Sequence, residues 1–159
     1  MSWFRHHAGT HQTQSPLAQA ALLAGLSSSE LRIVQSFLHE RRYLPGEVVF
    51  DEGEEGQALY FVLSGCVIIC HPGHMDNPIA ELGAGDFFGE LGLLDNWPRS
   101  AQARANEDAE LAVLFRGDFE RLMESHARIA SKISMHLARY LGQRLRGMVA
   151  RQHSESPSA

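Results

Sequence analysis

The chain has 159 residues and a formal net charge of -5, with 44% hydrophobic and 21% charged residues. These values are ordinary for one globular domain with a sizeable core. They argue against a membrane protein, because no apolar run approaches the roughly 18 residues that a spanning helix needs. The N-terminus also lacks the apolar centre of a secretory signal, so we expect a cytoplasmic protein.

The N-terminal part reads as a polar segment followed by helices. We predict disorder at 1–15, a short helix at 17–24 and a second helix at 28–39. Pro16 suits the first turn of the short helix. Ser27 and Glu30 have the spacing of a capping box, which marks the start of the second helix.

From residue 42 the pattern changes to short apolar segments separated by glycine- and proline-rich turns. Such segments are typical of a β-barrel or a double-sheet jelly roll. We predict strands at 42–44, 48–50, 58–63, 67–71, 79–82, 100–105 and 109–115. Cys66 and Cys70 fall on one face of a strand, roughly 13 Å apart. That distance is too long for a disulfide, so we predict two free thiols, as in a reducing compartment.

Helical periodicity returns after Gly117 and predicts helices at 118–125 and 126–151. The long helix would measure about 40 Å and extend past a small barrel. Its apolar stripe consists of Ile129, Ile133, Leu137, Leu141, Leu145 and Met148. We expect the stripe to pair with a second copy in a homodimer, although packing on its own barrel is the alternative. Residues 153–159 are expected to be a disordered tail.

The charge is uneven along the chain. Residues 126–159 hold six cationic residues and one acid, so they carry +5 and the remainder carries -10. Three interpretations fit this asymmetry: a solvated helix face, a ligand contact, or a surface for an anionic partner.

The segment 88–101 combines a glycine turn, one carboxylate, and an arginine beside a hydroxyl. Glu90 can accept hydrogen bonds from a ribose hydroxyl, and Arg99 can grip a phosphate with its planar fork. Free backbone N–H groups at a helix start favour an anion there. The set suits a ligand with a sugar at one end and a phosphate at the other. A plain salt bridge between Glu90 and Arg99 on a loop is the alternative.

On these residues the sequence resembles the cyclic nucleotide-binding domain family, the module of the bacterial catabolite activator protein and of protein kinase A regulatory subunits. Residues 88–103 are similar to the family's phosphate-binding cassette, and residues 49–65 to its glycine-punctuated barrel signature. The resemblance implies a fold that is mainly β with flanking α: an eight-stranded jelly-roll β-barrel with N-terminal helices and a long C-terminal helix. The domain would span 16–152.

The resemblance also implies roles for single residues. Glu90 would take the ribose 2′-OH, and Arg99 the cyclic phosphate. The other residues expected to line the cassette are Gly89, Leu91, Ser100 and Ala101. Tyr140 and Arg144 are i, i+4 neighbours on the long helix and are candidates to cap the base. Each could instead be a surface or dimer residue.

The expected function is therefore a non-catalytic sensor that binds cyclic AMP and signals to an unidentified effector when its long helix moves. Cyclic GMP remains possible, because Ser100 keeps a hydroxyl at the position where the family's cyclic GMP binders tend to have threonine. A DNA-associated regulator is an alternative, but sequence-specific DNA binding is not expected, since no recognition helix follows in the sequence. A second alternative is a degenerate scaffold domain that binds no ligand. A metal-dependent barrel enzyme is not favoured, because no His-x-His with a downstream acid occurs in the barrel.

Overall fold

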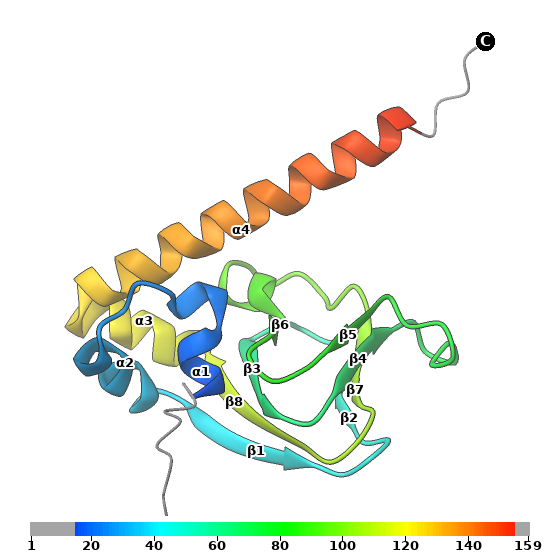
Figure 1. Ribbon diagram of the computed structural model, residues 1–159, viewed down its shortest axis with the longest axis horizontal. Helices are drawn as coiled ribbons and strands as arrows, with labels where there is room; N and C mark the ends of the chain where they lie inside the picture. The colour runs from blue at the N-terminus through cyan, green and yellow to red at the C-terminus, as the bar shows by residue number, and fades with distance from the viewer. Residues whose placement is uncertain (1–14, 155–159) are drawn as a thin grey trace, which may run out of the picture.

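The computed structural model describes residues 15–154, which form a β-sandwich with helices gathered at one side (Figure 1). Within these residues the strands make two four-stranded antiparallel sheets, ordered β1-β8-β3-β6 and β2-β7-β4-β5. The strands are β1 (His39–Tyr43), β2 (Val48–Phe50), β3 (Ala58–Ser64), β4 (Val67–Cys70), β5 (Ala80–Leu82), β6 (Phe87–Phe88), β7 (Gln102–Ala105) and β8 (Ala109–Phe115). The expected mainly β, jelly-roll fold with flanking helices is confirmed for the described part of the chain.

Two features of the sheets differ from the sequence prediction. β6 was not predicted, because two residues are too few to show a period; it pairs with Tyr60 and Phe61 of β3. β1 begins at His39, which the sequence placed at the end of a helix. His39 pairs with Val113 of β8, so the sheet captures a residue whose local sequence favoured a helix.

The helices of the described residues are α1 (Pro16–Gln19), α2 (Ser28–Gln35), α3 (Arg116–Ser125) and α4 (Ala127–Ser154), with two 3₁₀ turns, η1 (Ala21–Leu23) and η2 (Glu90–Leu93). The predicted capping box of α2 is confirmed. The Ser27 hydroxyl accepts a hydrogen bond from the Glu30 N–H at 3.2 Å, and the Glu30 carboxylate accepts one from the Ser27 N–H at 2.8 Å.

The disorder predicted for the two ends falls almost entirely on residues outside the described part, 1–14 and 155–159. Ser15 is described, and its side chain caps α1. α4 continues through Ser154, three residues beyond the predicted end of the long helix. Cys66 and Cys70 are free thiols, as predicted. Within residues 15–154, no helix is long and apolar enough to cross a membrane.

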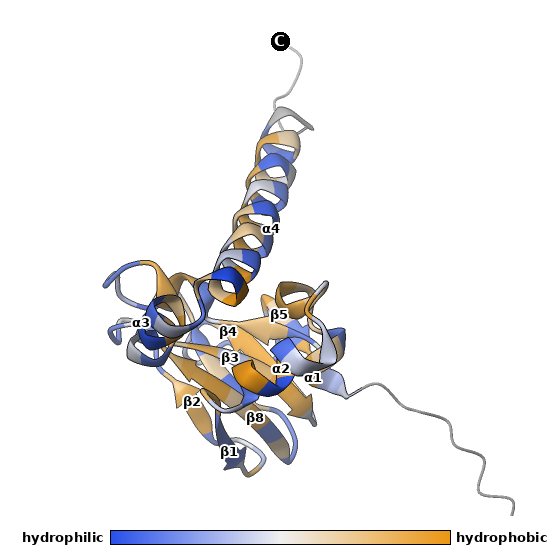
Figure 2. Cartoon of the chain, turned by 90° about the vertical axis from the view of Figure 1, so that its left-hand side faces the viewer, coloured by the Kyte–Doolittle hydropathy of each residue, from blue (hydrophilic) through white to orange (hydrophobic). Residues whose placement is uncertain are grey.

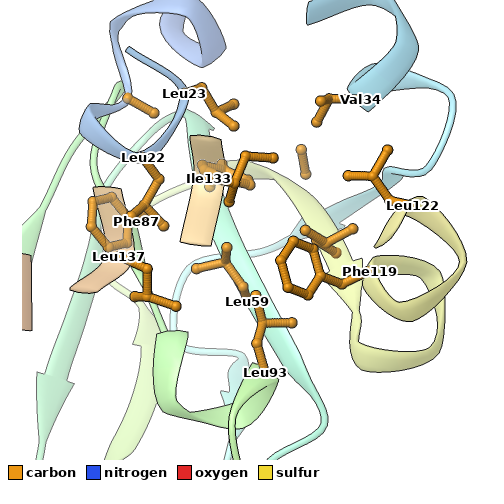
Figure 3. Packing of buried hydrophobic residues seen from close by; sticks show 14 of the residues in the cluster. Leu22, Leu23, Val34, Leu59, Phe87, Leu93, Phe119, Leu122, Ile133 and Leu137 are labelled. Atoms are coloured by element: carbon orange, nitrogen blue, oxygen red, sulfur yellow. The ribbon is translucent and has the colours of Figure 1, made fainter. Parts of the chain in front are cut away.

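Two hydrophobic clusters form the core of the described part of the chain. One lies between the sheets and includes Phe50, Val62 and Leu111. The other cluster packs the helices against β3 and β6. Figure 3 shows that Ile133 and Leu137 of α4 belong to it. Burial of side chains of this size contributes about 1.5–3 kcal/mol each, so α4 is held firmly on the sandwich at this point.

The apolar stripe of α4 is divided between two environments. Ile133 and Leu137 are 0% and 2% exposed, because the first half of the helix packs on its own domain. Leu145 and Met148 are 63% and 54% exposed, because the second half runs clear of the sheets (Figure 2). Packing on its own domain is therefore confirmed for the first half of the stripe, and the homodimer stays a prediction for the second half.

Candidate functional site

A cavity of about 650 Å³ lies between the η2 turn (Glu90–Leu93) with the loop after it, the sheet that contains β4 and β5, and α4. The eight residues singled out from the sequence all line this cavity: Gly89, Glu90, Leu91, Arg99, Ser100, Ala101, Tyr140 and Arg144. The fold thus brings together two segments that are about forty residues apart in the chain. Within residues 15–154, no group of three or more His, Cys, Asp or Glu side chains is placed to hold a metal ion.

Glycine at position 89 is required by the backbone and by the packing. Gly89 has a φ of +74° and precedes η2, so it occupies the left-handed region that favours glycine. A Cβ there would lie 2.8 Å from Nη1 of Arg99 and 3.1 Å from the Ala58 carbonyl oxygen. The glycine therefore makes room for the guanidinium of Arg99 to lie directly on the backbone.

Arg99 is half-buried and held by neutral groups. Its Nη1 donates to the Gly89 carbonyl at 3.1 Å, and its Nη2 donates to the Ala58 carbonyl at 2.9 Å. The guanidinium carbon lies 4.1 Å from the centre of the Phe50 ring, a cation–π contact. No ion pair among the described residues involves Arg99.

One donor of Arg99 is left over. Its Nε is buried and, among the described residues, has no hydrogen-bond partner. Burial lowers the pKa of the Arg99 guanidinium, while Tyr60 and Glu90 nearby raise it. A buried N–H without an acceptor costs about 1–3 kcal/mol. The site therefore contains a partly desolvated cation with one unused donor, and Arg99 lines the cavity that an anion would enter.

Glu90 is 5% exposed, and its Oε1 accepts a hydrogen bond from Nη1 of Arg144 at 3.0 Å. The same Nη1 lies 3.4 Å from the Tyr140 hydroxyl. The Tyr140 ring in turn packs on Phe87, with 4.7 Å between the ring centres. α4 thus reaches the cavity through two side chains and is tied to the carboxylate at its wall. The salt bridge that sequence reasoning weighed between Glu90 and Arg99 is not formed; Arg144 takes that position.

The remaining predicted residues differ in exposure. Leu91 and Ser100 are exposed, while Ala101 is 8% exposed and belongs to the cavity wall. Gly89 and Gly92 lie close to Arg99, which brings η2 beside the segment that leads into β7.

Several lining residues were not singled out from the sequence. Ile69 and Leu82 contribute apolar surface from β4 and β5, and Trp97, 77% exposed, stands at the edge. The strand pattern placed Ile69 and Leu82 in strands but gave no sign that one face would meet a ligand cavity. Trp97 offered a signal, since it is an aromatic residue two positions before Arg99, within the segment 88–101 that resembles the phosphate-binding cassette.

Comparison with known proteins places these features in a family. Residues 40–126 match the family described as Cyclic nucleotide-binding domain. The Cyclic AMP receptor protein of Thermus thermophilus is 41% identical over 122 residues, which cover 76% of this chain and 56% of that protein. Glutaminase 1 of Bradyrhizobium diazoefficiens is 36% identical over 135 residues, which cover 85% of this chain and 21% of that protein.

Solved structures agree with the sequence comparison. The crystal structure of the Thermus thermophilus Catabolite Activator Protein superposes with a TM-score of 0.75 and 38% identity, covering 84% of this chain and 62% of that one. The chain spans about half of the length of the receptor and about a fifth of the length of the glutaminase. The module therefore occurs within longer proteins, including an enzyme.

Proposed function

This chain belongs to the cyclic nucleotide-binding domain family, and we propose that its cavity binds cyclic AMP as the input of a non-catalytic sensor. The observation that carries the proposal is the pairing, in one cavity, of the partly desolvated guanidinium of Arg99 with the buried carboxylate of Glu90. A cyclic nucleotide presents one monoanionic phosphate and one free ribose hydroxyl, which are the two groups that this pair can recognise.

Arg99 takes the cyclic phosphate. Its Nη atoms are already held by two carbonyls, so the guanidinium is fixed before a ligand arrives. The guanidinium then makes a charge-assisted hydrogen bond to the phosphate with little further loss of rotamer freedom. Because the cation is partly desolvated, its attraction to an anion is stronger than it would be at an open surface.

Glu90 accepts the ribose 2′-OH. Its carboxylate is paired with Arg144, so the hydroxyl must share it with, or displace, a residue of α4. Ligand binding and the position of α4 are coupled for this reason. The ligand favours the arrangement of α4 in which Tyr140 or Arg144 caps the base, and that differential contact drives the switch.

The choice of cyclic AMP rests on two supports. Serine follows the phosphate arginine, whereas threonine at this position tends to accompany cyclic GMP in the family. The Thermus thermophilus relative is described as a cyclic AMP receptor. Cyclic GMP is the competing ligand to measure.

The exposed end of α4 supplies the output. We assign Leu145 and Met148 to contact with a second copy of the chain, because a large apolar stripe that leaves its own domain needs a partner to cover it. The dimer then presents the ligand-dependent position of α4 to an effector protein. We place the sensor in the cytoplasm, where its two free thiols remain reduced.

Thermal unfolding with and without ligand tests the proposal. A ligand that binds the folded state at 100 times its Kd stabilises it by about 2.7 kcal/mol. We expect cyclic AMP to raise the melting temperature more than cyclic GMP does. 5′-AMP, with the same base and an open dianionic phosphate, should have little effect. Equal melting temperatures with and without both cyclic nucleotides would contradict the proposed function.

A further inference from the structure

Arg116, the first residue of α3, makes an unusually complete set of contacts with the ligand loop. Its Nε and Nη2 both donate to the Gly92 carbonyl, at 3.0 and 2.7 Å. The carbonyls of Gly56 and Asp95 also lie within hydrogen-bond distance of Nη2 and share its second hydrogen, and Nη1 donates to the Asn96 side chain. The side chain therefore joins three stretches of chain: the turn before β3, η2, and the loop after η2.

Three of the residues that supply the acceptors line the cavity, although Arg116 itself does not. Gly56, Gly92 and Asp95 line the cavity, whereas Arg116 is not among its lining residues. Carbonyls near the end of a short helical turn lack partners within the turn. A planar guanidinium with five N–H donors can satisfy several of them at once, which lysine cannot do.

The same backbone also fixes Arg99. A Cβ on Gly56 would lie 3.3 Å from the Arg99 guanidinium carbon, and one on Gly92 would lie 3.0 Å from its Nη1. The backbone at Gly56 and Gly92 therefore lies close against the guanidinium of Arg99. The backbone N–H of Arg116 donates to the Gln57 carbonyl at 2.8 Å, which ties the start of α3 to the same turn.

We propose that Arg116 is a positioning residue of the nucleotide site: it holds loop 89–96 against the turn at Gly56 and links that loop to α3. α3 packs on α4, so the loop and the long helix are connected by a second route besides the Arg144–Glu90 pair. The expected effect of Arg116 on nucleotide affinity rests on the proposed function, whereas its effect on the stability of loop 89–96 does not.

Hydrogen exchange on the ligand-free protein tests the brace directly. The amides of Gly92, Leu94 and Asp95 donate to carbonyls within the η2 segment, so they report on its opening. In Arg116→Lys we expect their exchange to accelerate by about tenfold or more, as the loss of a charged hydrogen bond predicts. Exchange in β3 and β8 should stay as in the wild type.

Arg104→Lys is the matched control. Arg104 donates to the Gly46 carbonyl and to Gln102, so it is also an arginine that braces a glycine carbonyl, but it does not line the cavity. This control should leave loop exchange unchanged. Unchanged loop exchange in Arg116→Lys, or equal acceleration throughout β3 and β8, would overturn the proposal.

Calorimetric titration with cyclic AMP separates this proposal from the proposed function. We expect Arg116→Lys to bind about tenfold more weakly than the wild type, with Arg104→Lys unchanged. Equal affinity of Arg116→Lys and wild type would refute the positioning role. If the wild type binds neither cyclic AMP nor cyclic GMP, the proposed function fails, and the effect of Arg116 on nucleotide affinity fails with it. The hydrogen-exchange result still tests whether Arg116 holds loop 89–96 in place.

Discussion

Arg99 is fixed by carbonyls and rings rather than by a carboxylate, and this makes its role in recognition testable at a single position. Arg99→Lys keeps the charge but loses the fork that reaches both Gly89 and Ala58. The substitution therefore separates the contribution of charge from that of a fixed direction. Arg99→Ala, by contrast, removes both the charge and the fixed hydrogen-bond donors.

The role of Glu90 can be tested by changing the ligand, because a 2′-deoxy analogue lacks the hydroxyl that Glu90 is proposed to bind. We predict that wild type binds 2′-deoxy cyclic AMP about tenfold more weakly than cyclic AMP, since one hydrogen bond to a charged group is lost. Glu90→Ala should bind both ligands with nearly equal affinity, because the acceptor that distinguishes them is gone. Competition titration measures both ratios. The same loss in the two proteins would show that Glu90 does not read the 2′-OH.

Gly89 gives a second prediction at this scale. Gly89→Ala adds a Cβ that meets Arg99 Nη1 at 2.8 Å, at a φ of +74°. We expect a loss of about 1–3 kcal/mol in the free energy of unfolding, together with weaker nucleotide binding. Gly117→Ala is the control, since nothing lies within 4 Å of its added Cβ. Urea unfolding of the two variants makes the comparison; equal stabilities would contradict the account of the glycine turn.

At the scale of elements, α4 has two different halves. Leu137 is 2% exposed and packs in the core, so its substitution would unfold the domain and report nothing about a dimer. Leu145 and Met148 are the informative positions. We predict that Leu145→Glu with Met148→Glu changes a dimer into a monomer in sedimentation velocity, while Met123→Glu, on the exposed side of α3, does not. A monomeric wild type would exclude the helix-mediated dimer.

α4 is also tied to α2 by an ion pair, and this pair has a pH signature. Lys132 donates to both carboxylate oxygens of Glu30, at 2.8 and 2.9 Å. The hydrogen bond from Lys132, with that from the Ser27 N–H, lowers the pKa of Glu30 below its ordinary value of 4.5. A depressed carboxyl pKa means that the stabilisation is present above pH 4.5 and is lost as the pH falls through the folded-state value.

Lys132→Met should therefore reduce the free energy of unfolding at neutral pH, and the difference from wild type should shrink below pH 4.5. The effect is small, because the partners are near the surface. Arg128→Met, which removes an exposed charge one turn earlier in α4, is the control. Chemical unfolding across the pH range measures both. A difference independent of pH would mean that lost packing, rather than the ion pair, destabilises the variant.

For the whole molecule, the sequence predicted those parts of the site in which the functional side chains lie close together along the chain. Glu90 and Arg99 lie nine residues apart, and their types alone suggested a sugar and a phosphate. Tyr140 and Arg144 were found through helical spacing and through the resemblance to the family. The two sheets followed from short apolar segments between turns.

The features that the sequence missed depend on contacts between distant backbones. β6 has two residues and exists because β3 pairs with it. Arg116 braces carbonyl groups, and a carbonyl has no signature in the sequence. The division of the α4 stripe depends on where the sandwich ends, which local periodicity does not encode. Such features require the tertiary structure.

The central claim is that one cavity binds cyclic AMP through Arg99 and Glu90, and calorimetric titration of the wild type beside Arg99→Ala tests it most directly. We predict a Kd of about 1 μM or lower for the wild type, near -8.2 kcal/mol. Arg99→Ala should be weaker by at least about tenfold, since a charge-assisted bond is lost. No binding heat with the wild type, or equal affinity of the two proteins, would contradict the account.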